Sequence, residues 1–356
     1  MQNSSIPDSR QADRTLYDLI SAHRSALMGF AALWIILYHV WERLFKRVPV
    51  IGAIERFIVH FGYFGVEIFL FLSGMGLVFS IGRRSLSSFY WSRYSRLALP
   101  YASIAIVRAL VEHWTPMQAL KLLTGYAFLF EYAYSFLWYV QAIAVYYLLF
   151  PLYYAGLRRS RRPVAFTVVA LCVWEVLTVL ANLRFLDDLL VLTDRIPVFL
   201  LGVLLGELAK RKRLPAYRKA LPGAMLAFIV GLGVCLADFY HALPTVPHVL
   251  AFPIANLLLA LPLGLFLAML LDRPARRPSR TARALAFFGT LSLELYCVQD
   301  LYARDILIVW LNGLPALPFN IAAIALSIAI SWPAHWAFTR ILNAVNRRIS
   351  SQKALP

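Results

Sequence analysis

The sequence predicts an all-α protein, a polytopic helical bundle integral to a membrane, with about ten transmembrane helices and both termini in the cytoplasm. Composition is the first observation behind this fold class: 61% of the 356 residues are hydrophobic, whereas a soluble domain is about 45–50% apolar. The mean hydropathy is +0.67. Charged residues make up only 15% of the chain, and Lys and Arg outnumber Asp and Glu by 35 to 18. The second observation is that the apolar residues gather in long stretches, and the third is the position of the basic residues between these stretches.

Ten segments meet the requirement for a membrane-spanning helix, which needs about 20 mostly apolar residues to cross the hydrocarbon layer. In chain order they are residues 25–45, 60–81, 97–114, 135–157, 163–182, 193–209, 222–240, 248–271, 285–308 and 318–340. Together they predict a single transmembrane domain over residues 25–343. A cytoplasmic tail of residues 1–24 precedes this domain, and a cytoplasmic tail of residues 344–356 follows it.

The basic residues lie where the positive-inside rule expects them. With the N-terminus in the cytoplasm, most Lys and Arg fall in the two tails and in the inner segments 82–96, 158–162, 210–219 and 272–283. Cytoplasmic loops of membrane proteins carry such an excess of basic residues. Topology therefore explains the positive charge, and we expect membrane lipids, not nucleic acid, as partners. The runs RRSRR at 158–162 and KRKR at 210–213 are interpreted as anchors on anionic lipid.

Residues 115–135, between the third and fourth predicted spans, are too apolar for a free loop. Irregular backbone in a membrane must have its polar groups satisfied, and an amphipathic helix can lie in the interface plane. We therefore expect an interfacial or re-entrant helix there, on the outer side.

Polar side chains from several predicted spans reach the outer half of the membrane. An ionisable group in hydrocarbon is costly, so it marks either an internal pairing or a functional site. At about 1.5 Å of rise per residue, His39 and Glu67 lie at a similar depth. Other polar residues near the outer side are Trp138, Tyr139, Arg195, Gln299 and Asp300, while Glu294 and Tyr296 lie nearer the middle of the ninth span. Such a layer is what a buried site would need.

Each of these residues also has a simpler, structural interpretation. His39 would hydrogen-bond between helices, and Glu67 would pair with an internal arginine such as Arg108. Trp138 and Tyr139 would be aromatic residues of the interface belt.

Arg93 and Arg96 form a second cluster, at the inner end of the third span. Two residues three positions apart project from one side of a helix, and the guanidinium fork suits phosphate. They are therefore either phosphate ligands or ordinary topology arginines. The rise per residue separates them from the outer polar layer by about 20 Å, which a long, phosphate-tailed carrier would span.

Six ordered blocks resemble the membrane acyltransferases of the acyltransferase-3 group, in the form without a fused SGNH domain. They are GFAALWIILYH at 29–39, YFGVEIFLFLSGMGLVFS at 63–80, SFYWSRYSRLALPY at 88–101, FLWYVQAIAVYYLLFPL at 136–152, RIPVFLLGVLLGEL at 195–208 and LSLELYCVQD at 291–300. One block alone would be a weak signal, but six in order over nearly the whole chain indicate the family.

The resemblance implies an enzyme that takes an acyl group, often acetyl, from coenzyme A on the cytoplasmic side. It passes this group to a hydroxyl of a glycan, a lipid-linked sugar or another acceptor at the membrane. The resemblance also implies a multi-pass protein of a bacterial cytoplasmic (inner) membrane, with acyl-CoA as donor substrate and no permanently bound cofactor. We expect no metal site, because Cys172, Cys235 and Cys297 lie in apolar runs without metal-like spacing.

Residue roles follow from the same resemblance. His39 corresponds to the essential histidine of the family, and Arg93 and Arg96 to the pair associated with the coenzyme A phosphates. Glu67, Ser73, Trp138 and Glu294 fall at recurrent positions without an assigned role.

The chain departs from the family pattern at two positions. The usual Arg or Lys eleven residues before the histidine is Met28, and the histidine that commonly ends the ninth-span block is Gln299. Arg24 lies one turn before Met28, close to the helix face of His39, and is the candidate substitute and a further coenzyme A contact. Gln299 cannot relay a proton, although it can hydrogen-bond a carbonyl or a hydroxyl.

These residues predict a mechanism with His39 as general base and Glu67 as its orienting partner. Trp138, Tyr139 and Gln299 are the candidate donors to the developing oxyanion. A covalent acyl-His39 intermediate is the less favoured route. Two alternatives stay open: a transporter or flippase that uses the same buried polar residues, and a scaffold derived from an acyltransferase that has lost its activity.

Overall fold

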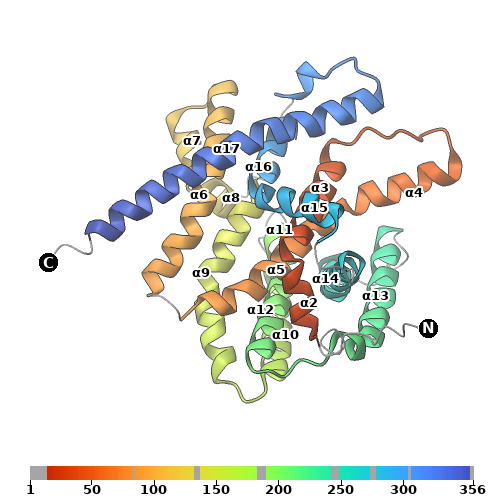
Figure 1. Ribbon diagram of the computed structural model, residues 1–356, viewed down its shortest axis with the longest axis vertical. Coiled ribbons are helices and arrows are strands. Elements are labelled where there is room, and N and C mark those ends of the chain that lie inside the picture. The colour runs from red at the N-terminus through yellow and green to blue at the C-terminus, as the bar shows by residue number, and fades with distance from the viewer. Residues whose placement is uncertain are drawn as a thin grey trace, which may run out of the picture. The chain divides into compact units, whose positions relative to one another are not determined.

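The computed structural model describes residues 14–82, 85–131, 137–182, 190–240, 242, 248–272, 278–303 and 306–352. Within these ranges the regular structure is helical, and the one extended pairing is an isolated β-bridge between Thr15 and Ala216 (Figure 1). The predicted all-α class is thereby confirmed for this part of the chain. Residues 1–13 and 353–356 of the predicted tails, and 132–135 of the predicted outer segment, lie outside the described residues.

The α-helices follow one another with short connections. They are α2 (Leu16–Ala22), α3 (Arg24–Val40), α4 (Pro49–His60), α5 (Phe64–Ser80), α6 (Leu86–Val111), α7 (Pro116–Leu123), α8 (Tyr126–Phe130), α9 (Trp138–Arg159), α10 (Pro163–Asn182), α11 (Leu190–Thr193), α12 (Ile196–Lys210), α13 (Tyr217–Phe239), α14 (His248–Leu271), α15 (Arg280–Thr290), α16 (Ser292–Ala303) and α17 (Ala316–Gln352). Two 3-10 turns, η1 (Phe61–Tyr63) and η3 (Ile308–Trp310), complete the described elements.

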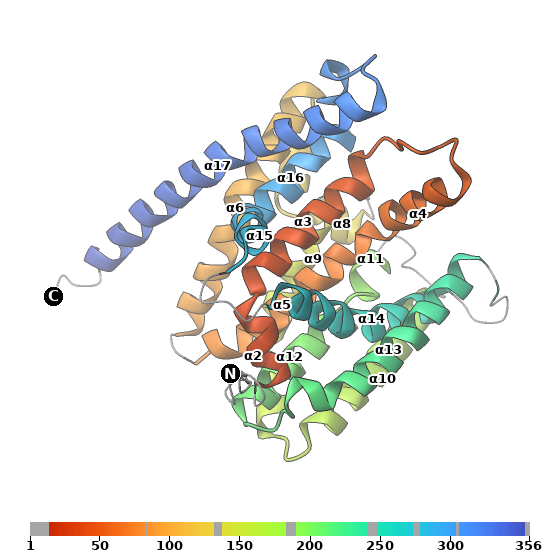
Figure 2. The same ribbon diagram turned by 45° about the vertical axis from the view of Figure 1, so that its right-hand side comes forward.

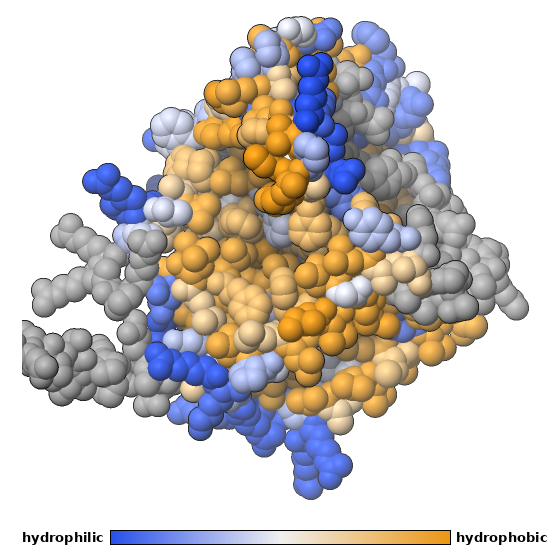
Figure 3. All heavy atoms as spheres, turned by 90° about the vertical axis from the view of Figure 1, so that its right-hand side faces the viewer, coloured by the Kyte–Doolittle hydropathy of each residue, from blue (hydrophilic) through white to orange (hydrophobic). Residues whose placement is uncertain are grey.

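Among the described residues, six helical segments are long and apolar enough to cross a membrane, and there are seven if the bent pair α2 and α3 is one span. The six are Pro49–Ser80, Trp138–Arg159, Pro163–Ala181, Tyr217–Phe239, Leu250–Leu271 and Ala316–Ile349. Hydrophobic residues accordingly dominate the molecular face drawn in Figure 3. The predicted count of ten and the cytoplasmic position of the termini stay predictions.

Several predicted spans have different boundaries in the structure. The first predicted span, 25–45, ends early because α3 stops at Val40. The ninth, 285–308, is broken at Leu291 into α15 and α16, and the last is part of the 37-residue α17. α7 and α8 occupy the outer segment, which is helical as expected where it is described.

The chain divides into two compact units. The first comprises Met1–Met28, Val66–Arg84 and Leu149–Phe287, and the second comprises Gly29–Gly65, Ser85–Leu148 and Phe288–Pro356. In the first unit α13 packs against α14, next to which both ribbon views draw it (Figures 1 and 2), and α12 contacts α10 and α14. In the second unit α16 packs against α6 and α17, and α6 also contacts α7.

Helices α5 and α12 form the centre of the first unit and cross backbone to backbone at glycines. A Cβ atom added to Gly74 would lie 2.3 Å from the Phe199 carbonyl oxygen, and one added to Gly202 would lie 2.1 Å from the Phe71 carbonyl oxygen. Gly202 and Gly206 are four residues apart, the small-xxx-small spacing that lets membrane helices approach closely. The contacts advance in the same direction along both helices, so α5 and α12 run parallel.

An ionic cluster holds the N-terminal segment of the first unit to the end of α14. Arg14 Nη1 donates to both carboxylate oxygens of Asp272, at 2.9 and 3.0 Å, and the His23 ring is hydrogen-bonded to the same carboxylate at 3.1 Å. Partial burial raises the pKa of Asp272, but the hydrogen bonds from His23 and Arg14 together outweigh burial and hold that pKa below its usual range. Since His23 is also where the chain bends by 66° between α2 and α3, the cluster fixes this bend.

In the second unit, Glu55 of α4 holds the turn that follows α3. Its carboxylate accepts hydrogen bonds from the Trp41 indole at 3.0 Å and from the backbone N–H groups of Leu44 and Phe45 at 2.7 and 3.0 Å. The chain after Val40 is thereby diverted from the helix axis. This explains why the first helix is shorter than the apolar stretch that predicts it.

The glycine crossing predicts a sharp difference between two Gly→Ala substitutions. Gly202→Ala places a methyl group against the Phe71 carbonyl and should lower the free energy of unfolding by at least about 2 kcal/mol, as overpacking of a tight core does. Gly233→Ala in α13 is the matched control, because nothing lies within 4 Å of its added Cβ. Thermal unfolding of the purified protein measures both. Equal melting temperatures for the two variants would contradict the close crossing.

Candidate functional site

Glu67 and Arg195 form a buried ion pair in the first unit. Glu67 lies in α5 with its side chain fully buried, and Arg195 Nε lies 3.1 Å from Glu67 Oε1. The Arg195 guanidinium also donates to the Val191 carbonyl at 3.2 Å and lies over the Phe252 ring at 5.0 Å. Glu67 is therefore paired with an internal arginine, as its structural interpretation predicted, but this arginine is Arg195 and not Arg108.

Arg24 lies against α5 in the same unit. Its Nη2 donates to the Leu72 carbonyl at 3.3 Å and would be 3.1 Å from a Cβ atom on Gly76, so the glycine leaves room for the guanidinium. Its Nε is buried without a hydrogen-bond partner among the described residues. A role for Arg24 as coenzyme A contact or as substitute at position 28 stays a prediction.

His39 lies in the last turn of α3, in the second unit, and its side chain is exposed. The adjacent Tyr38 ring meets the His39 ring edge-on at 4.6 Å between centroids, and Tyr38 also contacts His60 and Tyr63. We expected a buried imidazole, whereas the His39 residue is exposed near the end of α3. Its ring packs against that of Tyr38, which belongs to an aromatic cluster with His60 and Tyr63.

Trp138 and Tyr139 begin α9, and both side chains are buried in the protein. The Tyr139 N–H donates to the Tyr296 hydroxyl at 3.3 Å, and the two tyrosine rings pack edge-on at 5.1 Å. Burial within the second unit distinguishes these residues from belt aromatics that face lipid.

Glu294 of α16 is bound by His335 of α17, with His335 Nδ1 2.9 Å from Glu294 Oε1. The Glu294 side chain is only 8% exposed, so the imidazole supplies the polar partner that a buried carboxylate requires. We did not predict His335. Its signal was present in the sequence, as the one histidine inside the predicted span 318–340.

Gln299 and Asp300 end the predicted block of α16, and both are fully buried. Asp300 Oδ2 lies 3.2 Å from Arg108 Nε, and Arg108 is also paired with Glu112 at 3.2 Å. Gln299 Nε2 donates to the Leu295 carbonyl of its own helix, while Gln299 Oε1 has no hydrogen-bond partner among the described residues. The amide therefore retains an acceptor where the family pattern has an imidazole.

Arg93 and Arg96 both project from α6, with Arg96 exposed and Arg93 partly buried over the Phe89 ring at 5.7 Å. A groove with a volume of about 310 Å³ opens between α6, α7, α8 and α9, and neither arginine lines it. It runs along α6 from Tyr94 to Tyr101, whose hydroxyl accepts a hydrogen bond from Gln141 at 2.6 Å. The groove is otherwise lined mostly by apolar side chains.

The predicted site residues are thus distributed over both units. The first unit contains Glu67 and Arg24, and the second contains His39, Arg93, Arg96, Trp138, Tyr139, Glu294 and Gln299. The structure joins most of the buried ones to partners, whereas His39 and Arg96 are exposed. Whether His39 and Glu67 act together stays a prediction.

Helices with apolar surfaces, glycine crossings and buried ion pairs define an integral membrane protein whose interior carries polar groups. Residues 26–336 match the family model described as an acyltransferase domain, and the chain belongs to the acyltransferase-3 family. Comparisons with curated proteins and with solved structures give no significant match. The protein is therefore a multi-pass membrane acyltransferase.

The buried pair of Glu67 and Arg195 predicts a non-additive mutant cycle. Arg195→Met leaves a buried carboxylate without its partner and should lower the free energy of unfolding by about 3–5 kcal/mol. The double variant Glu67→Gln/Arg195→Met should lose less than the sum of the two single changes, by more than about 1 kcal/mol. Lys219→Met, at an exposed position of α13, is the control for loss of one positive charge. Strict additivity would show that the two side chains do not interact.

Proposed function

We propose that the protein transfers an acyl group, in the first instance acetyl, from coenzyme A to a hydroxyl of a glycan, a lipid-linked sugar or another acceptor at the membrane. The observation that carries this proposal is the family match over residues 26–336, because it makes the chain an acyltransferase. Coenzyme A would reach it from the cytoplasm, and the bacterial cytoplasmic membrane is the location that fits best.

His39 is the general base in this proposal. A hydroxyl is a poor nucleophile near neutral pH, so a base must take its proton as the oxygen attacks the thioester carbonyl. The resulting tetrahedral intermediate expels the coenzyme A thiolate, which recovers the proton from the imidazolium. One C–O bond forms, one C–S bond breaks, and the histidine returns to its neutral form.

The surroundings of His39 support this role. The edge contact with Tyr38 restricts the imidazole orientation, and its exposure leaves room for an acceptor to approach. A base must come within hydrogen-bond reach of the proton it removes.

Arg93 and Arg96 bind the coenzyme A phosphates in this proposal. The exposed Arg96 and the partly buried Arg93 offer charge-assisted donors suited to phosphate. The groove beside them begins at Tyr94, the residue after Arg93, and extends to Tyr101. That length is about 10 Å of helix, along which the pantetheine arm would lie.

Trp138, Tyr139 and Gln299 complete the proposed reaction centre. The Trp138 indole N–H and the Tyr139 hydroxyl are the candidate donors to the oxyanion. Gln299 Oε1, which has no hydrogen-bond partner among the described residues, is suited to accept from the acceptor hydroxyl and to orient it.

His39→Ala tests the catalytic assignment. We expect acyl transfer from radiolabelled acetyl-CoA to fall by a factor of about 10²–10⁴, the usual contribution of a general base. The assay would use purified protein returned to membranes from a strain that lacks it, so that the native acceptors are present. His60→Ala is the matched control, because His60 contacts the same Tyr38 ring. Near wild-type turnover in the His39 variant would overturn the mechanism.

The double variant Arg93→Gln/Arg96→Gln tests the donor site. It should raise the KM for acetyl-CoA by about 10²- to 10⁴-fold, since hydrogen bonds to charged groups contribute about 1.5–3 kcal/mol each and the variant removes two charged donors. The kcat should change little. Arg347→Gln, an exposed arginine of α17, is the control for a basic residue that only favours topology. A lower kcat with an unaltered KM would argue against phosphate binding by this pair.

A further inference from the structure

A second pocket, in the first unit, lies where α5, α9 and α12 end. Its volume is about 450 Å³, and it is lined by Phe79, Ile81, Gly82, Pro151, Tyr154, Ala155, Arg158 and Lys210. One wall is therefore apolar, and the other carries two basic side chains and a tyrosine. The positive-inside rule places this end of the helices at the cytoplasmic face.

The basic residues around this pocket do not all have the same role. Arg211 Nε donates to Glu207 Oε1 at 2.7 Å, so that its charge is compensated by a buried carboxylate. The rest of its guanidinium donates to three backbone carbonyls at the end of α9, those of Ser160, Leu157 and Arg158, at 2.8, 3.1 and 2.9 Å. The last carbonyls of a helix lack intrahelical partners and attract cations. Arg211 meets that need, and four of its five N–H groups are occupied by Glu207 and these carbonyls.

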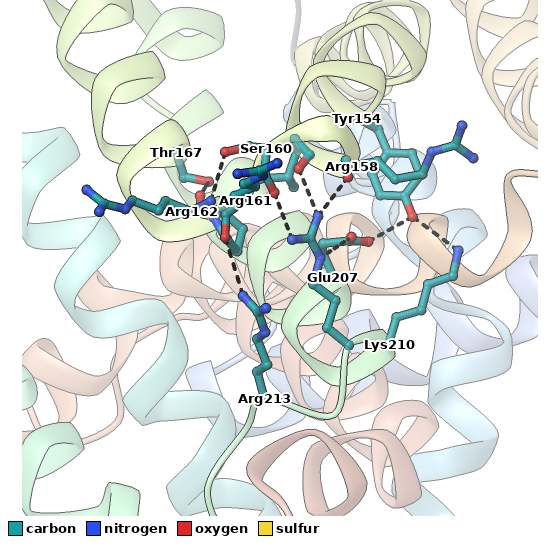
Figure 4. A network of polar contacts seen from close by, with 12 residues as sticks. Tyr154, Arg158, Ser160, Arg161, Arg162, Thr167, Glu207, Lys210 and Arg213 are labelled. Carbon is teal, nitrogen blue, oxygen red and sulfur yellow. Dashed lines mark hydrogen bonds and ion pairs between the residues drawn. The ribbon is translucent and has the colours of Figure 1, made fainter.

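Lys210 and Arg158 are left without a carboxylate. Neither forms an ion pair with any residue in the described part of the chain, and both are exposed. Lys210 Nζ lies 3.1 Å from the Tyr154 hydroxyl, which itself donates to Glu207 Oε2 at 2.8 Å. Figure 4 shows Glu207 and Lys210 reaching this hydroxyl from opposite sides. The hydroxyl thus links the compensated pair to the ammonium group and holds Lys210 at the pocket wall.

We propose that this pocket binds the phosphate ester of an amphiphilic molecule. Lys210 and Arg158 would hold the phosphate, since an ammonium and a guanidinium are its usual ligands in proteins. Phe79, Ile81 and Pro151 would cover the adjoining hydrocarbon. Basic pockets between transmembrane helices at the cytoplasmic face bind lipid head groups in this way. Two molecules carry this chemistry: an anionic phospholipid, and coenzyme A with its pantetheine arm. A phospholipid in this pocket would be independent of the proposed function, whereas coenzyme A there would compete with the donor site proposed at Arg93 and Arg96.

The test measures binding of two probes to purified full-length protein in a zwitterionic detergent. Native mass spectrometry with phosphatidylglycerol gives the affinity for the lipid phosphate, and equilibrium dialysis with labelled coenzyme A gives that for the cofactor phosphate. Arg158→Gln/Lys210→Gln should weaken binding of one probe by about tenfold or more. Arg159→Gln/Lys212→Gln is the matched control, because it removes the same charge from neighbouring exposed positions that do not line the pocket.

The outcomes distinguish the two sources of the phosphate, and they also test whether the pocket binds phosphate at all. Loss confined to phosphatidylglycerol identifies a lipid phosphate, and loss confined to coenzyme A identifies the cofactor. Equal loss in both double variants would mean that only the general positive charge matters, and no loss in either would mean that the pocket is not a phosphate site. Each of these two results overturns the proposal. If the double variant is unstable, Arg158→Gln replaces it, with Arg158→Lys expected to retain most of the binding.

Discussion

The close parallel contact of α5 and α12 is the constraint on which the first unit depends. At Gly74, Gly202 and Gly206, a backbone carbonyl oxygen of the opposite helix occupies the space that a Cβ atom would need. In lipid, helices gain little from hydrophobic burial against each other, so such close packing carries much of their association. Because the helices run in step, a residue on one has a fixed neighbour on the other. Glu67 and Arg195 are such neighbours, each seven residues before a crossing glycine.

Polar clusters lie near both ends of α5 and α12. The basic side chains in the two clusters differ in whether a carboxylate compensates their charge. Arg195 forms an ion pair with Glu67, donates to a backbone carbonyl and lies over an aromatic ring. About 24 Å further along α12, at 1.5 Å per residue, Arg211 binds Glu207 and the end of α9. Lys210 beside it has no carboxylate partner in the described part of the chain. Compensation inside the protein therefore separates structural cations from those available to an anion, although both kinds look alike as basic residues in the sequence.

Composition and hydrophobic stretches were sufficient to predict the all-α class, and ordered motifs were sufficient to predict the family. The partners of the polar residues were not predictable. Glu67 is paired by Arg195, which comes 128 positions later in the chain, and Glu294 by His335, which the sequence marks only as a lone histidine in an apolar span. The end of α3 was missed because the residues that follow Val40 are still apolar enough to continue a helix. The carboxylate of Glu55, on the next helix, and the side-chain amide of Asn320, in α17, bind this turn.

In the sequence, ionisable residues inside the predicted spans were the main candidates for catalysis. In the structure, most of the buried ones form structural pairs. The carboxylates of Glu67, Glu207, Glu294 and Asp300 are each buried and each paired with a cation or an imidazole. An ion pair in an apolar interior must be nearly complete, because an uncompensated charge there costs several kcal/mol. A group that has to meet a substrate, in contrast, needs an open side. His39, Arg96, Arg158 and Lys210 have one, since all four are exposed. In the described part of the chain, these pairs thus serve mainly to join structural elements, and several of the groups proposed above to bind and react are exposed ionisable residues.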